Sequence, residues 1–101
     1  MPAHNRLTLD ATLIARDALR YTPAGIPALD CTLHHESLQR EAGAERRVEC
    51  ELAAVAFAEV AKALASVPAE RTLRCEGFIA RRWRTGTSVA LHITRFTELK
   101  D

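Results

Sequence analysis

The sequence predicts a mainly β domain: a five-stranded antiparallel barrel with one short helix between the third and fourth strands. Apolar residues recur at every second position in five separate stretches, which is the spacing of half-buried strands. One alanine-rich stretch between the third and fourth of these has a helical spacing instead. With 101 residues the chain can build one core but not two, so we expect a single domain over residues 1–101.

The first predicted strand covers residues 5–14, where leucines alternate with polar residues. The alternation slips at residues 15–18, which indicates a bulge. Residues 22–27 predict a turn, because a proline there fixes φ and a glycine two positions later permits a positive φ. Alternation then returns in a second strand over residues 28–35.

The middle of the chain changes its pattern twice. Residues 36–46 are polar, contain a glycine and do not alternate, so they predict a long exposed loop. A third strand follows over residues 47–53. Residues 54–65 are rich in alanine, and their apolar positions recur every three or four residues, which predicts a helix that ends before Pro68.

The fourth and fifth predicted strands, residues 72–80 and 88–96, flank a basic segment over residues 81–86, Arg-Arg-Trp-Arg-Thr-Gly. Two alternating runs around a segment with glycine predict a β-hairpin with the basic residues at its tip. Three guanidinium groups and the chain's only tryptophan on such a tip indicate a contact outside the protein's own core.

This order of five strands and one helix matches the Greek-key barrel called the OB-fold, with an open α+β sheet as the alternative. In OB-folds the loops between strands one and two and between strands four and five flank the face that binds oligonucleotides. The predicted tip is the four–five loop.

The net charge is only +1, so a prediction of nucleic-acid binding depends on where the arginines lie. Single-stranded nucleic acid needs cations along its phosphates and flat surfaces for its bases. The candidate residues are Arg20, Arg46, Arg47, Arg81, Arg82, Trp83 and Arg84. The alternative is that Trp83 folds back onto the barrel while the arginines pair with nearby glutamates.

The sequence predicts no metal site, no cofactor and no enzyme activity. Cys31, Cys50 and Cys75 are far apart, contain no C-x-x-C pair, and are in phase with apolar neighbours, so we expect three buried thiols. His34 and His35 are adjacent on a strand and point to opposite faces, so they cannot share an ion. We find no nucleophile at a recognisable catalytic spacing.

The first residues show no signal-peptide pattern, and no apolar run is long enough to suggest a membrane span, so we expect a cytoplasmic location and no membrane contact.

The chain resembles the primosomal replication protein N family, relatives of bacterial single-stranded DNA-binding protein. The resemblance covers nearly the whole chain, and its most specific part is residues 35–43. The other matching stretches are Asn5-Arg6-Leu7, Pro23-Ala24-Gly25-Ile26-Pro27, Leu33-His34, Cys50, Gly77-Phe78-Ile79 and Leu91-His92. The resemblance implies a homodimeric OB-fold protein that binds single-stranded DNA and contacts the primosomal helicase and other primosome proteins in replication restart.

The chain also departs from this family. Ala44 and Glu49 stand where the family has aromatic residues, Glu36 where it has a basic residue, and Trp83 where it has a lysine. These departures leave two alternatives open: non-sequence-specific DNA binding through the basic hairpin, or an adaptor that contacts a helicase with weak or no DNA binding. The sequence does not separate DNA from RNA as the ligand.

Overall fold

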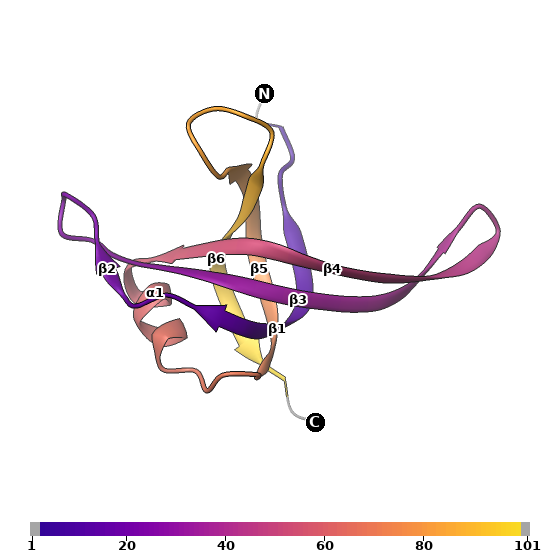
Figure 1. Cartoon of the computed structure of the whole chain (residues 1–101), viewed down its shortest axis with the longest axis horizontal. Coiled ribbons are helices and arrows are strands. Elements are labelled where there is room, and N and C mark those ends of the chain that lie inside the picture. The colour runs from indigo at the N-terminus through magenta and orange to yellow at the C-terminus, as the bar shows by residue number, and fades with distance from the viewer. Residues whose placement is uncertain (1–2, 100–101) are drawn as a thin grey trace.

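The computed structural model describes residues 3–99 and is mainly β (Figure 1). The elements follow in the order β1 (Leu7–Arg16), β2 (Arg20–Tyr21), β3 (Pro27–Glu41), β4 (Ala44–Phe57), α1 (Ala58–Ala65), β5 (Thr72–Arg81) and β6 (Val89–Glu98). The described part of the chain has no helix of the length and apolarity that crossing a bilayer requires.

Five long strands close into a barrel. The sheet order is β1-β5-β6-β4-β3-β2, and β1 also pairs with β3, which closes the five long strands into a ring and leaves the short β2 outside it. The prediction of an all-antiparallel barrel is wrong in one place, because β4 and β6 run parallel where Ala54, Val55 and Ala56 pair with residues 91–93. The two strands are joined through α1 and β5, and this long crossover lets them run in the same direction.

The core lies inside the barrel and is plugged at one end by α1. The fully buried large side chains are Leu13, Leu29, Leu33, Leu64, Leu73, Leu91 and Cys75. Most of them occupy the alternating positions that predicted the strands, and Leu64 comes from the helix. The predicted bulge is present in β1, where the register with β3 shifts between Leu13 and Ala15.

The predicted helix begins too early in the sequence. Residues 54–57 continue β4, and α1 begins only at Ala58. Ala54 and Ala56 are 3% and 0% exposed because they lie in the middle of the sheet, paired with both β3 and β6. Their small side chains fit this crowded position, so the alanine run reflects packing as well as helix propensity.

The predicted loop over residues 36–46 is instead part of a projecting two-stranded arm, the paired stretch of β3 and β4 over residues 34–51. β3 and β4 pair without interruption as far as Glu41 and Ala44 and turn through Ala42 and Gly43. Both turn residues have positive φ, 53° and 77°, as in the tight turns that suit β-hairpins. The arm extends beyond the barrel (Figure 1) and both its faces meet solvent, so its strands carry no apolar alternation.

The prediction of three buried thiols holds for Cys31 and Cys75 but is wrong for Cys50, which is exposed. Cys50 lies on the arm, beyond the part of β4 that contributes to the core. Cys50 alternates with Val48 and Leu52 as a buried residue would, but no layer covers that stretch of β4.

Candidate nucleic-acid interface

The basic segment forms the wide tip of the β5–β6 hairpin, as predicted. The strands pair as far as Arg81 and Val89, and the Arg82 backbone N–H donates to the Ser88 carbonyl over 2.8 Å. Gly86 has a φ of 95°, a conformation that L side chains rarely adopt. The tip projects from one end of the barrel (Figure 1), and residues 81–88 are all exposed.

Trp83 lies at the surface with 60% of its area exposed. The guanidinium carbon of Arg82 is 4.6 Å from the centroid of the indole ring, close enough for a cation–π contact. Trp83 is thus not folded into the barrel, and its ring remains open to a ligand.

Beside the tip is an open groove of about 470 Å³, which we call the hairpin groove. Its charged and aromatic lining comes from Arg81, Arg82 and Trp83 of the tip and from Arg20 and Asp30. The remaining lining residues, most of them small or apolar, are Asp17, Cys31, Ala53, Ala54, Val55, Phe57, Ala90 and His92. The fold thus brings Arg20, the first residue of β2, into the same groove as the basic tip.

Arg20 is already paired within the protein. Its Nε lies 2.7 Å from one carboxylate oxygen of Asp30, and a second guanidinium nitrogen lies 3.3 Å from the other. The hydrogen bond to Asp30 raises the pKa of Arg20 above its ordinary value. Both side chains are about half exposed, so the pair orients the guanidinium at the groove edge without removing it from solvent.

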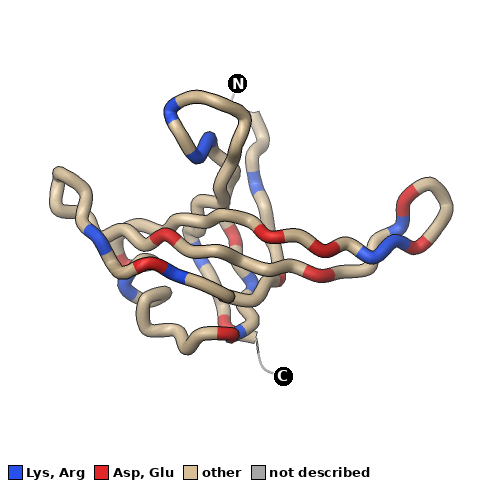
Figure 2. The backbone as a smooth tube through the Cα atoms, viewed as in Figure 1, with Lys and Arg blue, Asp and Glu red and all other residues tan. Residues whose placement is uncertain are grey.

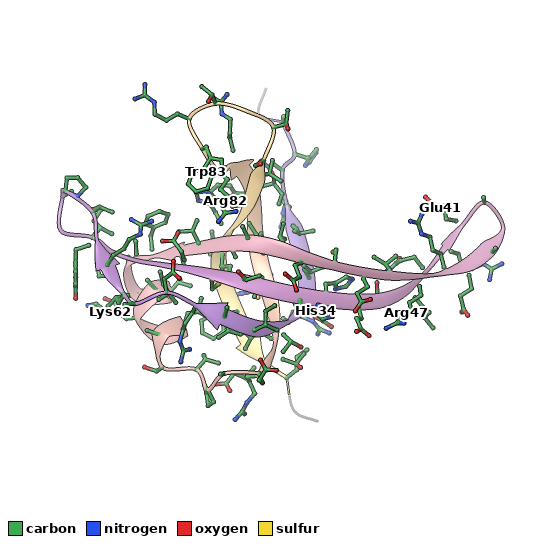
Figure 3. The ribbon with its side chains drawn as sticks, viewed as in Figure 1. His34, Glu41, Arg47, Lys62, Arg82 and Trp83 are labelled. Carbon is green, nitrogen blue, oxygen red and sulfur yellow. The ribbon has the colours of Figure 1, made fainter. Side chains whose placement is uncertain are left out.

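Arg46 and Arg47 are not part of this groove. They lie on the arm, well away from Arg82 and Trp83 (Figure 3). Arg46 pairs with Glu41 over 2.6 Å, and Arg47 pairs with Glu36 over 3.3 Å. The structure therefore divides the candidate residues into a groove group (Arg20, Arg81, Arg82 and Trp83), an arm group (Arg46 and Arg47), and Arg84, which lies on the hairpin tip but does not line the groove.

The two groups differ in local charge. Within residues 3–99, no carboxylate lies at ion-pair distance from Arg81, Arg82 or Arg84. At the end of the arm, by contrast, acidic and basic residues lie close together (Figure 2). Positive charge is therefore concentrated at the hairpin tip and balanced along the arm.

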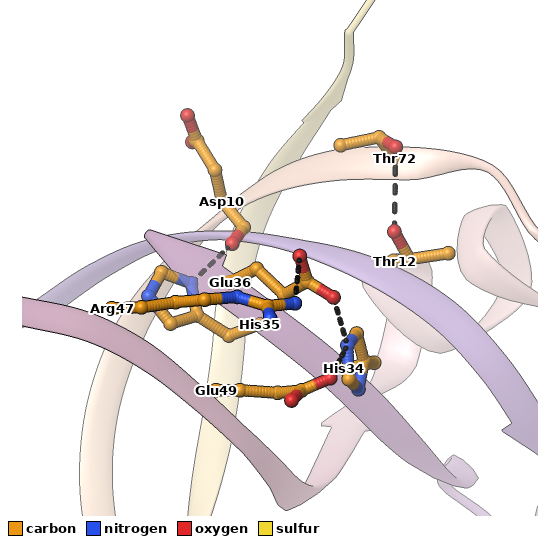
Figure 4. Close-up of polar contacts among 8 residues, drawn as sticks. All are labelled: Asp10, Thr12, His34, His35, Glu36, Arg47, Glu49 and Thr72. Carbon is orange, nitrogen blue, oxygen red and sulfur yellow. Dashed lines mark hydrogen bonds and ion pairs between the residues drawn. The ribbon is translucent and has the colours of Figure 1, made fainter. Parts of the chain in front are cut away.

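The arm also holds an imidazole–carboxylate cluster that the sequence did not predict. His34 Nε2 lies 3.2 Å from Glu36 and 3.4 Å from Glu49, and Arg47 approaches Glu36 from the other side (Figure 4). The hydrogen bonds from His34 and Arg47 lower the pKa of Glu36.

The donor atoms of His34, Glu36 and Glu49 lie within 4.8 Å of one another, a set that could hold a divalent cation. The two carboxylates are exposed and partly neutralised by Arg47. Together with His34 they already form an ion-pair network. His35 faces different partners, with Nδ1 2.7 Å from the Asp10 carbonyl, as expected for adjacent residues of a strand.

Phe57 and His92 also line the hairpin groove but were absent from the candidate set. Phe57 lies within the predicted helix over residues 54–65, but in the structure it ends β4 and is 38% exposed. His92 follows the buried Leu91 on β6, so the alternation of the strand points its side chain outward, toward the groove.

A protein-family model matches residues 5–95, and it describes another single-strand binding protein family. The replication restart protein PriB of Bordetella pertussis is 42% identical over 89 residues, which cover 88% of this chain and 83% of that protein. The PriB of Neisseria gonorrhoeae is 34% identical over 96 residues, 95% of each chain. These relatives are named as restart proteins rather than as enzymes.

Solved structures give the same relationship. The PriB protein of Ralstonia solanacearum superposes with a TM-score of 0.88 at 35% identity, covering 95% of this chain and 98% of that one. The single-stranded DNA binding protein of Thermus aquaticus superposes with a TM-score of 0.76 at 25% identity, covering 96% of this chain and 50% of that one.

Proposed function

The chain belongs to the replication restart protein PriB group of the single-strand binding proteins, and on that premise we propose that it binds single-stranded DNA through the hairpin groove. The binding residues are Arg81, Arg82, Trp83 and Arg84 at the tip. Arg20 lines the same groove and contributes a further phosphate contact once it leaves Asp30. Binding is independent of sequence, because phosphates and base faces are common to every strand. The protein acts in the primosome during replication restart.

The observation that supports this proposal best is the concentration of unpaired arginines around an exposed tryptophan. Arg81, Arg82 and Arg84 have no carboxylate partner within residues 3–99, so binding a phosphate breaks no ion pair. Arginine offers forked donors to phosphate and a flat face to bases, and tryptophan is a strong stacking side chain.

The arm arginines contribute less in this proposal. Arg46 and Arg47 must leave Glu41 and Glu36 before they can contact a phosphate, and the same glutamates repel the DNA. We expect them to act as outer contacts for a longer strand.

The test is a titration of Trp83 fluorescence with an oligothymidylate at several salt concentrations. Phosphate contacts by the three tip arginines predict a log–log salt slope of about −2 per protomer, and a fourth contact by Arg20, after it leaves Asp30, brings the slope to about −3. Binding that does not depend on salt, or no binding at low salt, would contradict the proposal.

Matched double variants locate the contact. Arg82→Gln with Arg84→Gln removes two tip charges and is expected to reduce the size of the slope by about 1.4. Arg46→Gln with Arg47→Gln removes two arm charges and is expected to have a smaller effect. Equal effects of the two pairs would place the contact elsewhere.

A second candidate function is a protein-interaction adaptor that contacts the primosomal helicase and binds DNA weakly. The arm supports it, because its charges are balanced and Leu38 is 64% exposed, a surface better suited to a protein than to a polyanion. Leu38→Ala, which removes an exposed apolar side chain from the arm, separates the two functions. The adaptor is favoured if helicase stimulation falls while oligonucleotide affinity is unchanged.

We also propose a homodimer formed by pairing of first strands. β1 pairs with β5 along Leu7–Thr12, but its opposite edge meets β3 only from Thr12 onward. The segment over residues 7–11 thus keeps one edge without a strand partner in the described structure, and free edges favour pairing with a second chain.

A further inference from the structure

Three aromatic rings form a continuous row across the outer surface of the barrel. Phe57, His92 and Phe78 come from β4, β6 and β5, which are neighbours in the sheet. The His92 ring stacks on Phe78 with centroids 4.9 Å apart and planes inclined by 19°. On its other side, His92 lies 5.9 Å from Phe57 with an inclination of 32°.

The row is fixed by the strand register. Phe78 lies directly opposite His92 in the antiparallel β5–β6 pair, and Val55 lies opposite His92 in the parallel β4–β6 pair. Phe57 is two residues beyond Val55, so its side chain leaves the same face of β4. All three rings therefore point away from the core.

The outer rings remain open to solvent. Phe57 is 38% exposed and Phe78 is 39% exposed. Their strands are two strand spacings apart, about 10 Å, so each ring can receive its own ligand group.

The row also connects two depressions of the surface. Phe57 and His92 line the hairpin groove, whereas Phe78 lines a second depression of about 270 Å³ together with Asn5, Arg6 and Thr94. Arginines thus border both ends of the row: Arg82 on one side and Arg6 on the other.

We propose that Phe57, His92 and Phe78 form a second base-stacking site, which takes unpaired nucleobases from a strand whose phosphates are held at the hairpin tip. This inference rests on the proposed DNA-binding function, which it extends from the groove across β6 to β5. The row ends in an exposed ring on each side and has arginines beside it. It therefore provides flat surfaces for bases and cations for phosphates, which an unpaired strand requires.

The test compares two oligonucleotides of equal length, an oligothymidylate and an abasic strand, on the full-length protein. Phe57→Leu and Phe78→Leu keep the apolar bulk but remove the flat ring. Each variant is expected to bind oligothymidylate about fivefold or more weakly than the wild type, while its affinity for the abasic strand is unchanged. Leu38→Ala, which removes an exposed apolar side chain from the arm, serves as the matched control and is expected to change neither affinity.

Unchanged oligothymidylate affinity in both phenylalanine variants would overturn the stacking site, as would an equal loss for the two strands. If the same variants lost only helicase binding, the row would be a protein contact instead. A wild type that binds neither strand would refute the proposed function itself. Because Phe57 directly precedes α1, its variant is checked for folding by circular dichroism, and Phe78→Leu decides the matter if Phe57→Leu is unfolded.

Discussion

The three cysteines differ in whether their thiols are buried or exposed. Burial raises the pKa of Cys31 to about 12 and that of Cys75 to about 11. Cys50 has the same alternating neighbours but lies exposed on the arm. Reactivity requires the thiolate and access to it, so the three thiols divide into two protected groups and one accessible group.

We therefore expect one fast-reacting thiol per native chain. A thiol-reactive chromogenic reagent at pH 8 should modify Cys50 within minutes and reach Cys31 and Cys75 only after denaturation. Cys50→Ser is the control and should abolish the fast phase. Two or more fast thiols in the native protein would contradict the burial of Cys31 or Cys75.

Gly77 is a second position where one side chain matters. An added Cβ would lie 1.8 Å from the His92 carbonyl oxygen and 2.8 Å from its carbon, both backbone atoms of the neighbouring strand. The register of β5 and β6 shifts beside this glycine, so the close approach belongs to a bulge.

Gly77→Ala is expected to lower the free energy of unfolding by about 1–3 kcal/mol or more, because the strands must separate. Chemical denaturation measures this loss. Gly25→Ala is the matched control. The space around Gly25 is open, so this substitution costs only the backbone strain of a positive φ, about 1 kcal/mol of the free energy of unfolding. A smaller loss for Gly77→Ala than for Gly25→Ala would show that the strands adjust freely.

Among the strands, the β3–β4 arm behaves differently from the barrel because no second layer covers it. Its pairing depends on the ladder, on surface ion pairs such as Arg46–Glu41, and on the turn. Exposed ion pairs of this kind contribute about 0–1 kcal/mol each. The turn carries an identifiable cost, since Ala42 has a φ of 53°, which asparagine and glycine tolerate better than alanine.

Ala42→Asn is therefore expected to stabilise the arm by about 0.5–1 kcal/mol, since Asn-Gly is a favoured pair for this turn. Amide hydrogen exchange of residues 36–49 should slow by up to about fivefold. Ala44→Asn, beside the turn in β4, is the control. Unchanged or faster exchange in Ala42→Asn would show that the turn conformation does not limit opening of the arm.

The barrel as a whole leaves one edge of the segment over residues 7–11 without a strand partner in the described structure. A symmetric pair of first strands would cover this edge and place Thr8 near the same segment of the second chain. The dimer proposed above therefore depends on backbone pairing along this edge, and an added charge beside the edge should weaken it.

Sedimentation equilibrium should give twice the chain mass of 11.2 kDa for the wild type. Thr8→Lys, an exposed substitution, should shift the mass toward the monomer because the two added charges would lie close together along the paired edges. Ala69→Lys, on the loop after α1, adds the same charge elsewhere and should leave the mass unchanged. A dimer that persists in Thr8→Lys would place the interface on another surface.

The sequence by itself determined the features whose signal is local. Alternating apolar residues identified β1, β5 and β6, Pro23 and Gly25 identified the turn before β3, and the basic segment identified the hairpin tip. These elements bury one face or require particular φ values, and both constraints act on neighbouring residues. The matched stretches of residues likewise indicated the family, which the comparisons confirmed.

Only the tertiary structure decided what depends on distant neighbours. Ala54 and Ala56 belong to a strand because β3 and β6 enclose them, and the polar arm is a hairpin because its own ladder suffices without a core. The same long-range pairing brought Arg20 to the basic tip and separated it from Arg46 and Arg47. It also aligned Phe57, His92 and Phe78, since strand register, which no local pattern records, sets which side chains of three strands meet.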